Sequence, residues 1–195
     1  MGGRRLPLLT EMSVAVWELR CGAVNDFAML ANVDDLDGDA GMFEARGEPK
    51  DWMHRPAVEF IADPRRKKQK PRADVSAFVP GALVLNEKAG KALGPFLSQF
   101  GQMLELHCAG ETLYFYNVTK LVDCVDAEKS ERRRSGSIAM EAFFEDNVPG
   151  EPAVFKDSLM APIRIYVNDA AKAEVERIVA EAGLTGIECG PPQRF

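Results

Sequence analysis

The sequence predicts an α+β fold, with mostly antiparallel sheet and two amphipathic helices that recur in strand–helix–strand units. Three observations predict it. Apolar residues repeat at helical spacing in two windows, short apolar runs flank both windows, and residues 112–119 alternate as a β-strand does. A chain of 195 residues with 46% apolar side chains can bury a full core, and we expect one domain.

The two helical windows share one pattern. Each begins at an asparagine, Asn86 or Asn168, has apolar residues at offsets 3, 7, 10, 11 and 14, and reaches a glycine at offset 15. Asparagine is a favoured N-cap residue and glycine a favoured C-cap residue. We therefore expect four-turn helices that end at Gly101 and Gly183.

The first helix contains Gly94-Pro95, which should kink or break it because proline has no amide hydrogen to donate. The apolar stripe of a helix must pack on a sheet, so we expect both units to lie on one sheet. Apolar runs and period-two alternation predict the strands. These strands are 14–20, 26–33, 58–61, 83–85, 103–108, 112–119, 137–144, 152–156, 163–167 and 185–189.

A basic run at residues 65–72 divides the chain into a lead segment, 1–72, and a core, 73–195. The run could bind an anion or nucleic acid, but it contains proline and no aromatic residue, which favours a linker. Residues 1–72 hold 12 acidic and 12 basic side chains, whereas residues 73–195 hold 18 acidic and 12 basic ones. The core therefore carries the whole net charge of −6, which suits a basic protein partner better than nucleic acid.

Cysteine spacing and hydropathy indicate the compartment. No CxxC pair occurs, and we expect four reduced thiols and a cytoplasmic protein. No run of 18 apolar residues is present, so we expect no membrane-spanning helix. The cysteines are Cys21, Cys108, Cys124 and Cys189.

The stretch from Glu111 to Ser130 is the most informative. Aromatic and apolar residues on both faces of its first half indicate a strand buried on both sides. Asp126 is expected to accept backbone amides in a turn that Ser130 caps from the other side. The predicted faces of the strand are Leu113, Phe115 and Asn117 on one side, and Tyr114, Tyr116 and Val118 on the other.

Tyr-Phe-Tyr-Asn-Val at 114–118, then Val-Asp-Cys-Val-Asp at 122–126 and Ser130, resembles the "YY-x-N-V … D-A-L-D-x-x-x-S" pattern of a bacterial family. This is immunity protein family 11 of polymorphic toxin systems. The resemblance covers most of residues 74–189, while residues 1–72 match weakly and the basic run and Pro95 lie outside the pattern. The matching positions are Asp74, Asn86, Glu87, Tyr114, Asn117, Asp123, Asp126, Ser130, Phe155 and Leu184-Thr-Gly186.

The resemblance implies a protein without enzymatic activity or cofactor that binds and neutralises a cognate toxin. We expect a monomer or weak homodimer with no nucleic-acid or membrane partner. The acidic loop at 34–39 is not predicted to bind calcium or another metal, because loop positions six and twelve hold Ala40 and Arg46. The candidate partner-binding residues are acidic: Asp34, Asp35, Asp37, Asp39, Asp123, Asp126, Glu128 and Glu131.

An alternative remains open at this point. Asp123, Cys124 and Asp126 could line a cleft in a small enzyme or ligand-binding module. A deep apolar pocket that converges on these three residues would favour that alternative. A shallow acidic surface would favour the immunity role.

Overall fold

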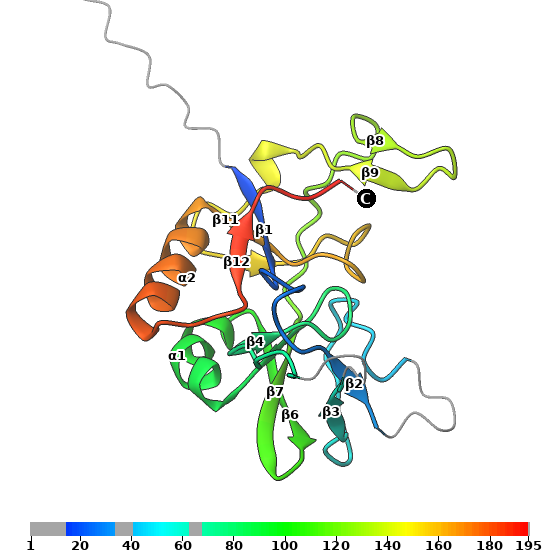
Figure 1. Cartoon of the computed structure of the whole chain (residues 1–195). Helices are drawn as coiled ribbons and strands as arrows, with labels where there is room; N and C mark the ends of the chain where they lie inside the picture. Colours follow the sequence, from blue (N-terminus) through cyan, green and yellow to red (C-terminus); the bar gives the residue numbers. More distant parts are fainter. Residues whose placement is uncertain (1–14, 34–40, 63–67, 195) are drawn as a thin grey trace, which may run out of the picture.

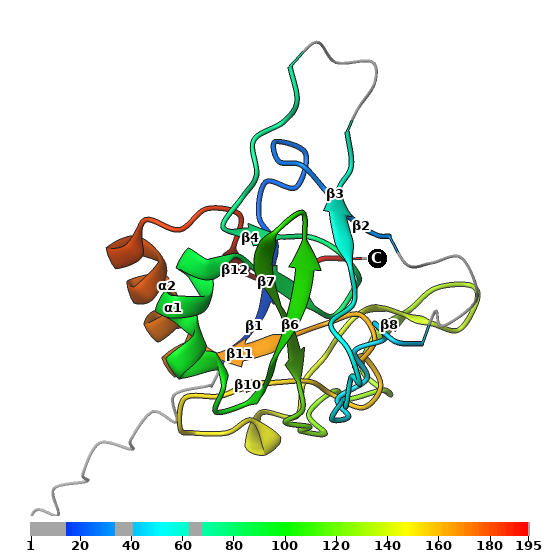
Figure 2. The same ribbon diagram turned by 90° about the horizontal axis from the view of Figure 1, so that it is seen from below.

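The computed structural model describes residues 15–33, 41–62 and 68–194. Within them the fold is α+β as predicted, with antiparallel sheets and two α-helices. Figure 1 shows the two helices together on one side of the molecule, and Figure 2 shows the same arrangement from below. The helices α1 (Glu87–Leu97) and α2 (Asp169–Ala182) contact each other.

The first sheet contains the strands that precede and follow α1. Its strand order is β4-β5-β7-β6, and every neighbouring pair is antiparallel. β5 and β6, which precede and follow the helix, are therefore parallel to each other with β7 between them. The strands are β4 (Val75–Ser76), β5 (Leu83–Leu85), β6 (Gly101–Cys108) and β7 (Glu111–Val118).

The second sheet belongs to α2 and repeats this plan. Its order is β10-β11-β1-β12, again antiparallel throughout, so β11 and β12 flank the helix in sequence and enclose β1. β1 comes from the N-terminal part of the chain but takes the position that β7 has in the first sheet. The strands are β1 (Val16–Arg20), β10 (Val154–Phe155), β11 (Tyr166–Asn168) and β12 (Glu188–Gly190).

The strand–helix–strand repeat is therefore present, but the expectation of one shared sheet is wrong. Each unit surrounds its own central strand, β7 or β1, so the two units form separate sheets. Their helices and both sheets enclose one common apolar core. The sequence pattern could not show this, because the central strand of the second unit lies 150 residues away from β11 along the chain.

The helix ends agree with the predictions in part. Asn86 and Asn168 are both N-caps, and Gly183 ends α2 in the left-handed conformation with φ 57°. The predicted cap at Gly101 is wrong, because α1 continues through Pro95 and ends at Leu97. Gly101 instead starts β6, where an added Cβ would lie 2.3 Å from the carbonyl oxygen of Asn117.

The side chains of the two asparagine caps differ in the number of hydrogen bonds that they make. The Asn86 side chain accepts from the Ala89 amide and donates to Asp74. Asn168 is buried and has four partners: it accepts from two amides and donates to two carbonyls.

We predict that Asn86→Ala costs about 1 kcal/mol of unfolding free energy and Asn168→Ala about 2–3 kcal/mol, since buried groups lose their partners. Equal losses in chemical denaturation would contradict this difference.

β7 is buried on both faces, as its alternation predicted. Tyr116 and Val118 belong to the core beneath the helices, and Leu113 and Phe115 belong to a second apolar cluster on the opposite face. That cluster is covered by residues from the segments 30–33 and 41–60, including the hairpin of β2 (Leu30–Asn32) and β3 (Val58–Phe60). Asn117 lies on the second face and donates to the Glu48 carbonyl at 2.8 Å, which ties this cover to the sheet.

The expected strand at 137–144 is shorter than predicted. β9 (Ile138–Met140) pairs with β8 (Glu131–Arg132) as a two-stranded hairpin, and a 3₁₀ helix η1 (Glu145–Asn147) follows. The apolar run after β7 is not a strand and makes single bridges at Leu121 and Val125. All four cysteines are free, as predicted. No helix in the described part of the chain is long and apolar enough to cross a bilayer.

Candidate protein-binding surface

The turn predicted at Asp126 and Ser130 is present. The Asp126 carboxylate accepts from the amides of Glu128 and Lys129 at 3.0 and 3.1 Å, and it pairs with the Lys129 ammonium at 3.3 Å. Ser130 closes the turn, since its hydroxyl donates to the Asp126 carbonyl at 2.6 Å and accepts from the Ala142 amide. Asp126 is only 3% exposed, so its carboxylate holds the turn rather than facing a partner.

The other candidate carboxylates in the described residues are exposed, unlike that of Asp126. Asp123, Glu128 and Glu131 are exposed. Glu131 pairs with Arg194 at 2.8 Å, and Lys129 stands between the glutamates, so this end of the turn has mixed charge. The remaining candidates, Asp34, Asp35, Asp37 and Asp39, lie outside the described residues.

Three chain segments meet at Asp123. The Asn147 side chain donates to the Asp123 carbonyl at 2.7 Å, and the Ser158 hydroxyl donates to the Asp123 carboxylate. The Phe144 amide donates to the neighbouring Cys124 carbonyl at 2.7 Å. The exposed apolar and acidic residues of these three segments are called the Asp123 surface here: Leu121, Asp123, Phe144, Glu145, Asp146 and Leu159.

The Asp123 surface has large apolar side chains in the open. Leu121 is 47% exposed, Phe144 44% and Leu159 55%. Exposed apolar residues grouped with polar neighbours are typical of protein-binding sites. Sequence analysis found Asp123 but missed these three residues, because local periodicity does not show which apolar side chains remain uncovered. The only sequence signal was the acidic doublet Glu145-Asp146 directly after two phenylalanines.

Buried Asp157 stabilises the backbone under this surface by accepting hydrogen bonds from it. One carboxylate oxygen accepts from the amides of Cys124 and Val125 at 2.8 and 2.7 Å, and the other accepts from the Leu159 amide at 2.8 Å. Two of the three segments are thereby fixed by one side chain. Such preorganisation lowers the entropy lost when a partner binds.

The adjacent Lys156 is buried, with 0% exposure, and its ammonium donates to three carbonyls. The acceptors are Ala45 at 2.5 Å and Gly81 and Ala161 at 2.6 Å each. Burial, together with the positive charge of Lys50, lowers the pKa of Lys156 to about 7. The backbone of Lys156 also bonds residues 120 and 122, so this residue connects the cover, the core and the Asp123 surface.

The surroundings of Asp123, Cys124 and Asp126 do not favour a nucleophile or an acid–base pair among these three residues. Cys124 is 0% exposed, and burial together with the Asp157 charge raises the pKa of its thiol to about 12. A nucleophilic cysteine needs the opposite shift. Asp126 is engaged in the turn, and only Asp123 of the three proposed cleft residues faces solvent.

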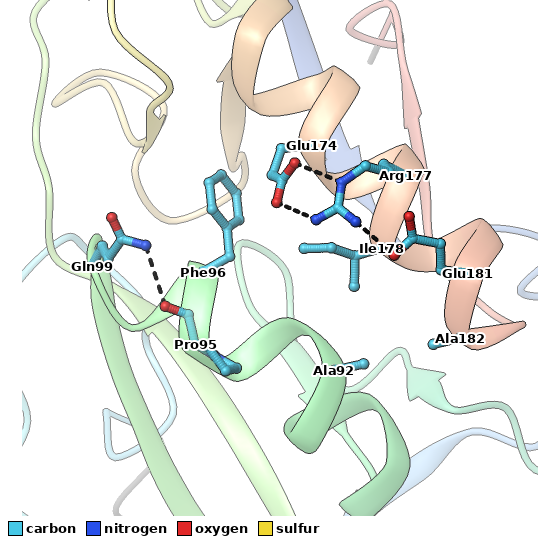
Figure 3. Close-up of a pocket in the computed structure, with 9 residues that line it drawn as sticks. All are labelled: Ala92, Pro95, Phe96, Gln99, Glu174, Arg177, Ile178, Glu181 and Ala182. Carbon is cyan, nitrogen blue, oxygen red and sulfur yellow. Dashed lines mark hydrogen bonds and ion pairs between the residues drawn. The ribbon is translucent and has the colours of Figure 1, made fainter.

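A separate recess of about 530 Å³ lies between α1 and α2 (Figure 3). Phe96, Ile178 and other apolar residues line it, and Arg177 is its one basic lining residue. Glu174 holds the Arg177 guanidinium with two bonds of 2.9 and 2.7 Å, and Glu181 adds a third of 2.5 Å. The only cation of the recess is therefore already neutralised by its own helix.

A scan against protein-family models finds no match for the sequence, and a search of curated proteins finds no similar sequence.

Proposed function

We propose that this protein binds and neutralises a cognate bacterial toxin in the cytoplasm by forming a stoichiometric complex, as an immunity protein of a polymorphic toxin system. The observation that carries the proposal is the Asp123 surface, a group of exposed apolar and acidic side chains that includes one residue, Asp123, matching the immunity-family pattern. The resemblance described above supplies the class of partner. Enzymatic turnover is not part of the proposal.

The composition of the Asp123 surface supports protein binding. Binding energy at protein interfaces concentrates in a few central apolar or aromatic residues that a polar rim surrounds. Phe144 fits the role of such a residue, and Leu121 and Leu159 are exposed on the other two meeting segments. The carboxylates of Asp123, Glu145 and Asp146 supply the rim and favour a basic partner.

Charge supports rapid capture. A toxin must be bound before it acts, and complementary charge raises association rates more than it raises affinity. The residues from 73 onward carry the net charge of −6, and two of their exposed carboxylates, Glu145 and Asp146, lie on η1. We therefore expect association to slow as salt concentration rises.

The test first looks for a toxin gene beside this one, and then co-expresses and purifies that toxin with the protein. Toxin inhibition should be complete at about one protein per toxin. Phe144→Ala should weaken binding at least about tenfold, because exposed aromatic residues are frequent hot spots. Glu145→Lys with Asp146→Lys should slow association about tenfold at low salt. Met53→Ala, which changes an apolar residue that is 99% exposed elsewhere, is the matched control and should change neither.

Two outcomes would overturn parts of this proposal. Protection at far below one protein per toxin would mean turnover, and would return the enzyme alternative to first place. Unchanged binding by the Phe144→Ala variant, with Met53→Ala as control, would show that the toxin binds elsewhere.

A further inference from the structure

A recess of about 300 Å³, which we call the Glu18 recess, lies where β1 of the second sheet meets the turn between β4 and β5 of the first. Its walls are residues 18–21, residues 77–83, and Ile163 and Ile165 just before β11. Of these lining residues, all within the described chain, only Glu18 and Arg20 are charged, and apolar side chains form most of the rest. A mostly apolar recess with a few polar groups is typical of a small-molecule site.

Hydrogen bonds fix the walls of the Glu18 recess. The Leu19 amide donates to the Ile165 carbonyl at 2.9 Å. The Gly81 carbonyl accepts from the ammonium of Lys156 at 2.6 Å, and Lys156 itself is 0% exposed behind the turn. A Cβ on Gly81 would lie 2.8 Å from the Pro162 carbonyl oxygen, so the turn and the segment before β11 approach closely. The recess is thus formed before any ligand binds, which lowers the entropy cost of binding.

The carboxylate of Glu18 is the polar group of this recess. Glu18 is only 7% exposed, and its Oε2 accepts from Arg164 at 2.6 Å, Arg20 at 3.0 Å and the Gln193 amide at 3.2 Å. Within the part of the chain that the structure describes, Oε1 accepts no hydrogen bond, yet it is not one of the fully buried unpaired oxygens. Because Glu18 lines the recess, we infer that its Oε1 is open to it.

The ion pairs around Glu18 contain one more carboxylate than guanidinium. Arg164 pairs with Glu18 and Glu141, and Arg20 pairs with Glu18 and, at 2.8 Å, with Glu188. Two cations therefore serve three carboxylates in this cluster. A ligand that brings one positive charge to Glu18 would balance the cluster, whereas an anionic ligand would be repelled.

We propose that the Glu18 recess binds a small molecule with an apolar body and a protonated amine, such as an arylalkylamine. The ammonium donates to Oε1 of Glu18, and the apolar body is buried between the β4–β5 turn and Ile163. A charge-assisted hydrogen bond in a site shielded from water is stronger than a neutral one, and burial of the body adds a hydrophobic contribution. The inference goes beyond the proposed function, since the recess and the Asp123 surface share no residue.

An NMR titration of the pure full-length protein with 2-phenylethylamine tests the site without any toxin. The amide signals of residues 77–83 and 163–165 should shift, with a dissociation constant of about 1 mM or lower. The matched ligands are 2-phenylethanol, which has the same body without the charge, and 3-phenylpropanoate, which carries a carboxylate. Each should bind at least about tenfold more weakly, because a hydrogen bond between charged groups contributes more than a neutral one.

Two variants locate the ligand. Ile163→Trp should weaken amine binding at least about tenfold, because the larger ring fills the recess, and a side chain that is 39% exposed tolerates the change. Ile61→Trp is the matched control, since it makes the same change at an isoleucine that is 51% exposed outside the recess, and it should bind like the wild type. Glu18→Gln should remove the preference for the amine over the alcohol.

Should Glu18→Gln fail to fold, since Glu18 also pairs with Arg164, the comparison of amine with alcohol in the wild type decides the same point. Amide signals that do not move at about 10 mM amine would overturn the proposal. So would equal binding of the amine and the alcohol by the wild type, or an Ile163→Trp variant that binds the amine as tightly as Ile61→Trp does.

Discussion

Replacing Arg164 with methionine should lower the free energy of unfolding by about 3–5 kcal/mol. The guanidinium is almost completely buried and lies 2.6 Å from Glu18 and 2.8 Å from Glu141, whose carboxylates are also buried. The Tyr166 hydroxyl donates to the same Glu141 oxygen at 2.9 Å. Methionine fills a similar volume but leaves two carboxylates buried without their cation.

Chemical denaturation measures this loss, with Arg177→Met as the control. Arg177 also contacts two carboxylates, but half of its side chain is exposed, so its replacement should cost much less. Equal losses at Arg164 and Arg177 would show that burial of the triad contributes little to stability.

Replacing Lys156 with methionine should lower the free energy of unfolding by about 3 kcal/mol at pH 8, because the buried carbonyls around the amine lose their donor. These carbonyls belong to Ala45, Gly81 and Ala161, far apart in sequence. Lys129→Met is the matched control, since that side chain is 76% exposed, and it should cost under about 0.5 kcal/mol. A neutral result at Lys156 would mean that the three segments hold together without the amine.

The same substitution should remove a pH dependence. The pKa of Lys156 is lowered to about 7 in the folded protein, below the ordinary value of 10.5. The unfolded chain then binds this proton more tightly, so stability increases as pH rises above 7. From pH 7 to pH 8 the wild type should gain about 1 kcal/mol relative to the Lys156→Met variant. If the free energies of unfolding of the wild type and the Lys156→Met variant changed equally between pH 7 and pH 8, the lowered pKa would be contradicted.

The local features of this protein were determined by the sequence alone. Asn86 and Asn168 cap their helices, and Gly183 ends the second one, because caps depend on residues a few positions apart. The two faces of β7 and the Asp126–Ser130 turn were predictable for the same reason. The wrong prediction at Gly101 also shows the limit of local reasoning, since that glycine is required by the close approach of β7.

Only the tertiary structure decided which distant segments meet. β1 inserts between β11 and β12, Lys156 donates to carbonyls of two remote segments at Ala45 and Gly81, and Arg164 joins Glu18 to Glu141. Within the candidate site, Asp123 was predictable as a polar residue after an apolar run, but the exposure of Phe144 beside it was not. Strand order and exposure depend on contacts between residues far apart in the chain. Periodicity within one segment does not predict those contacts.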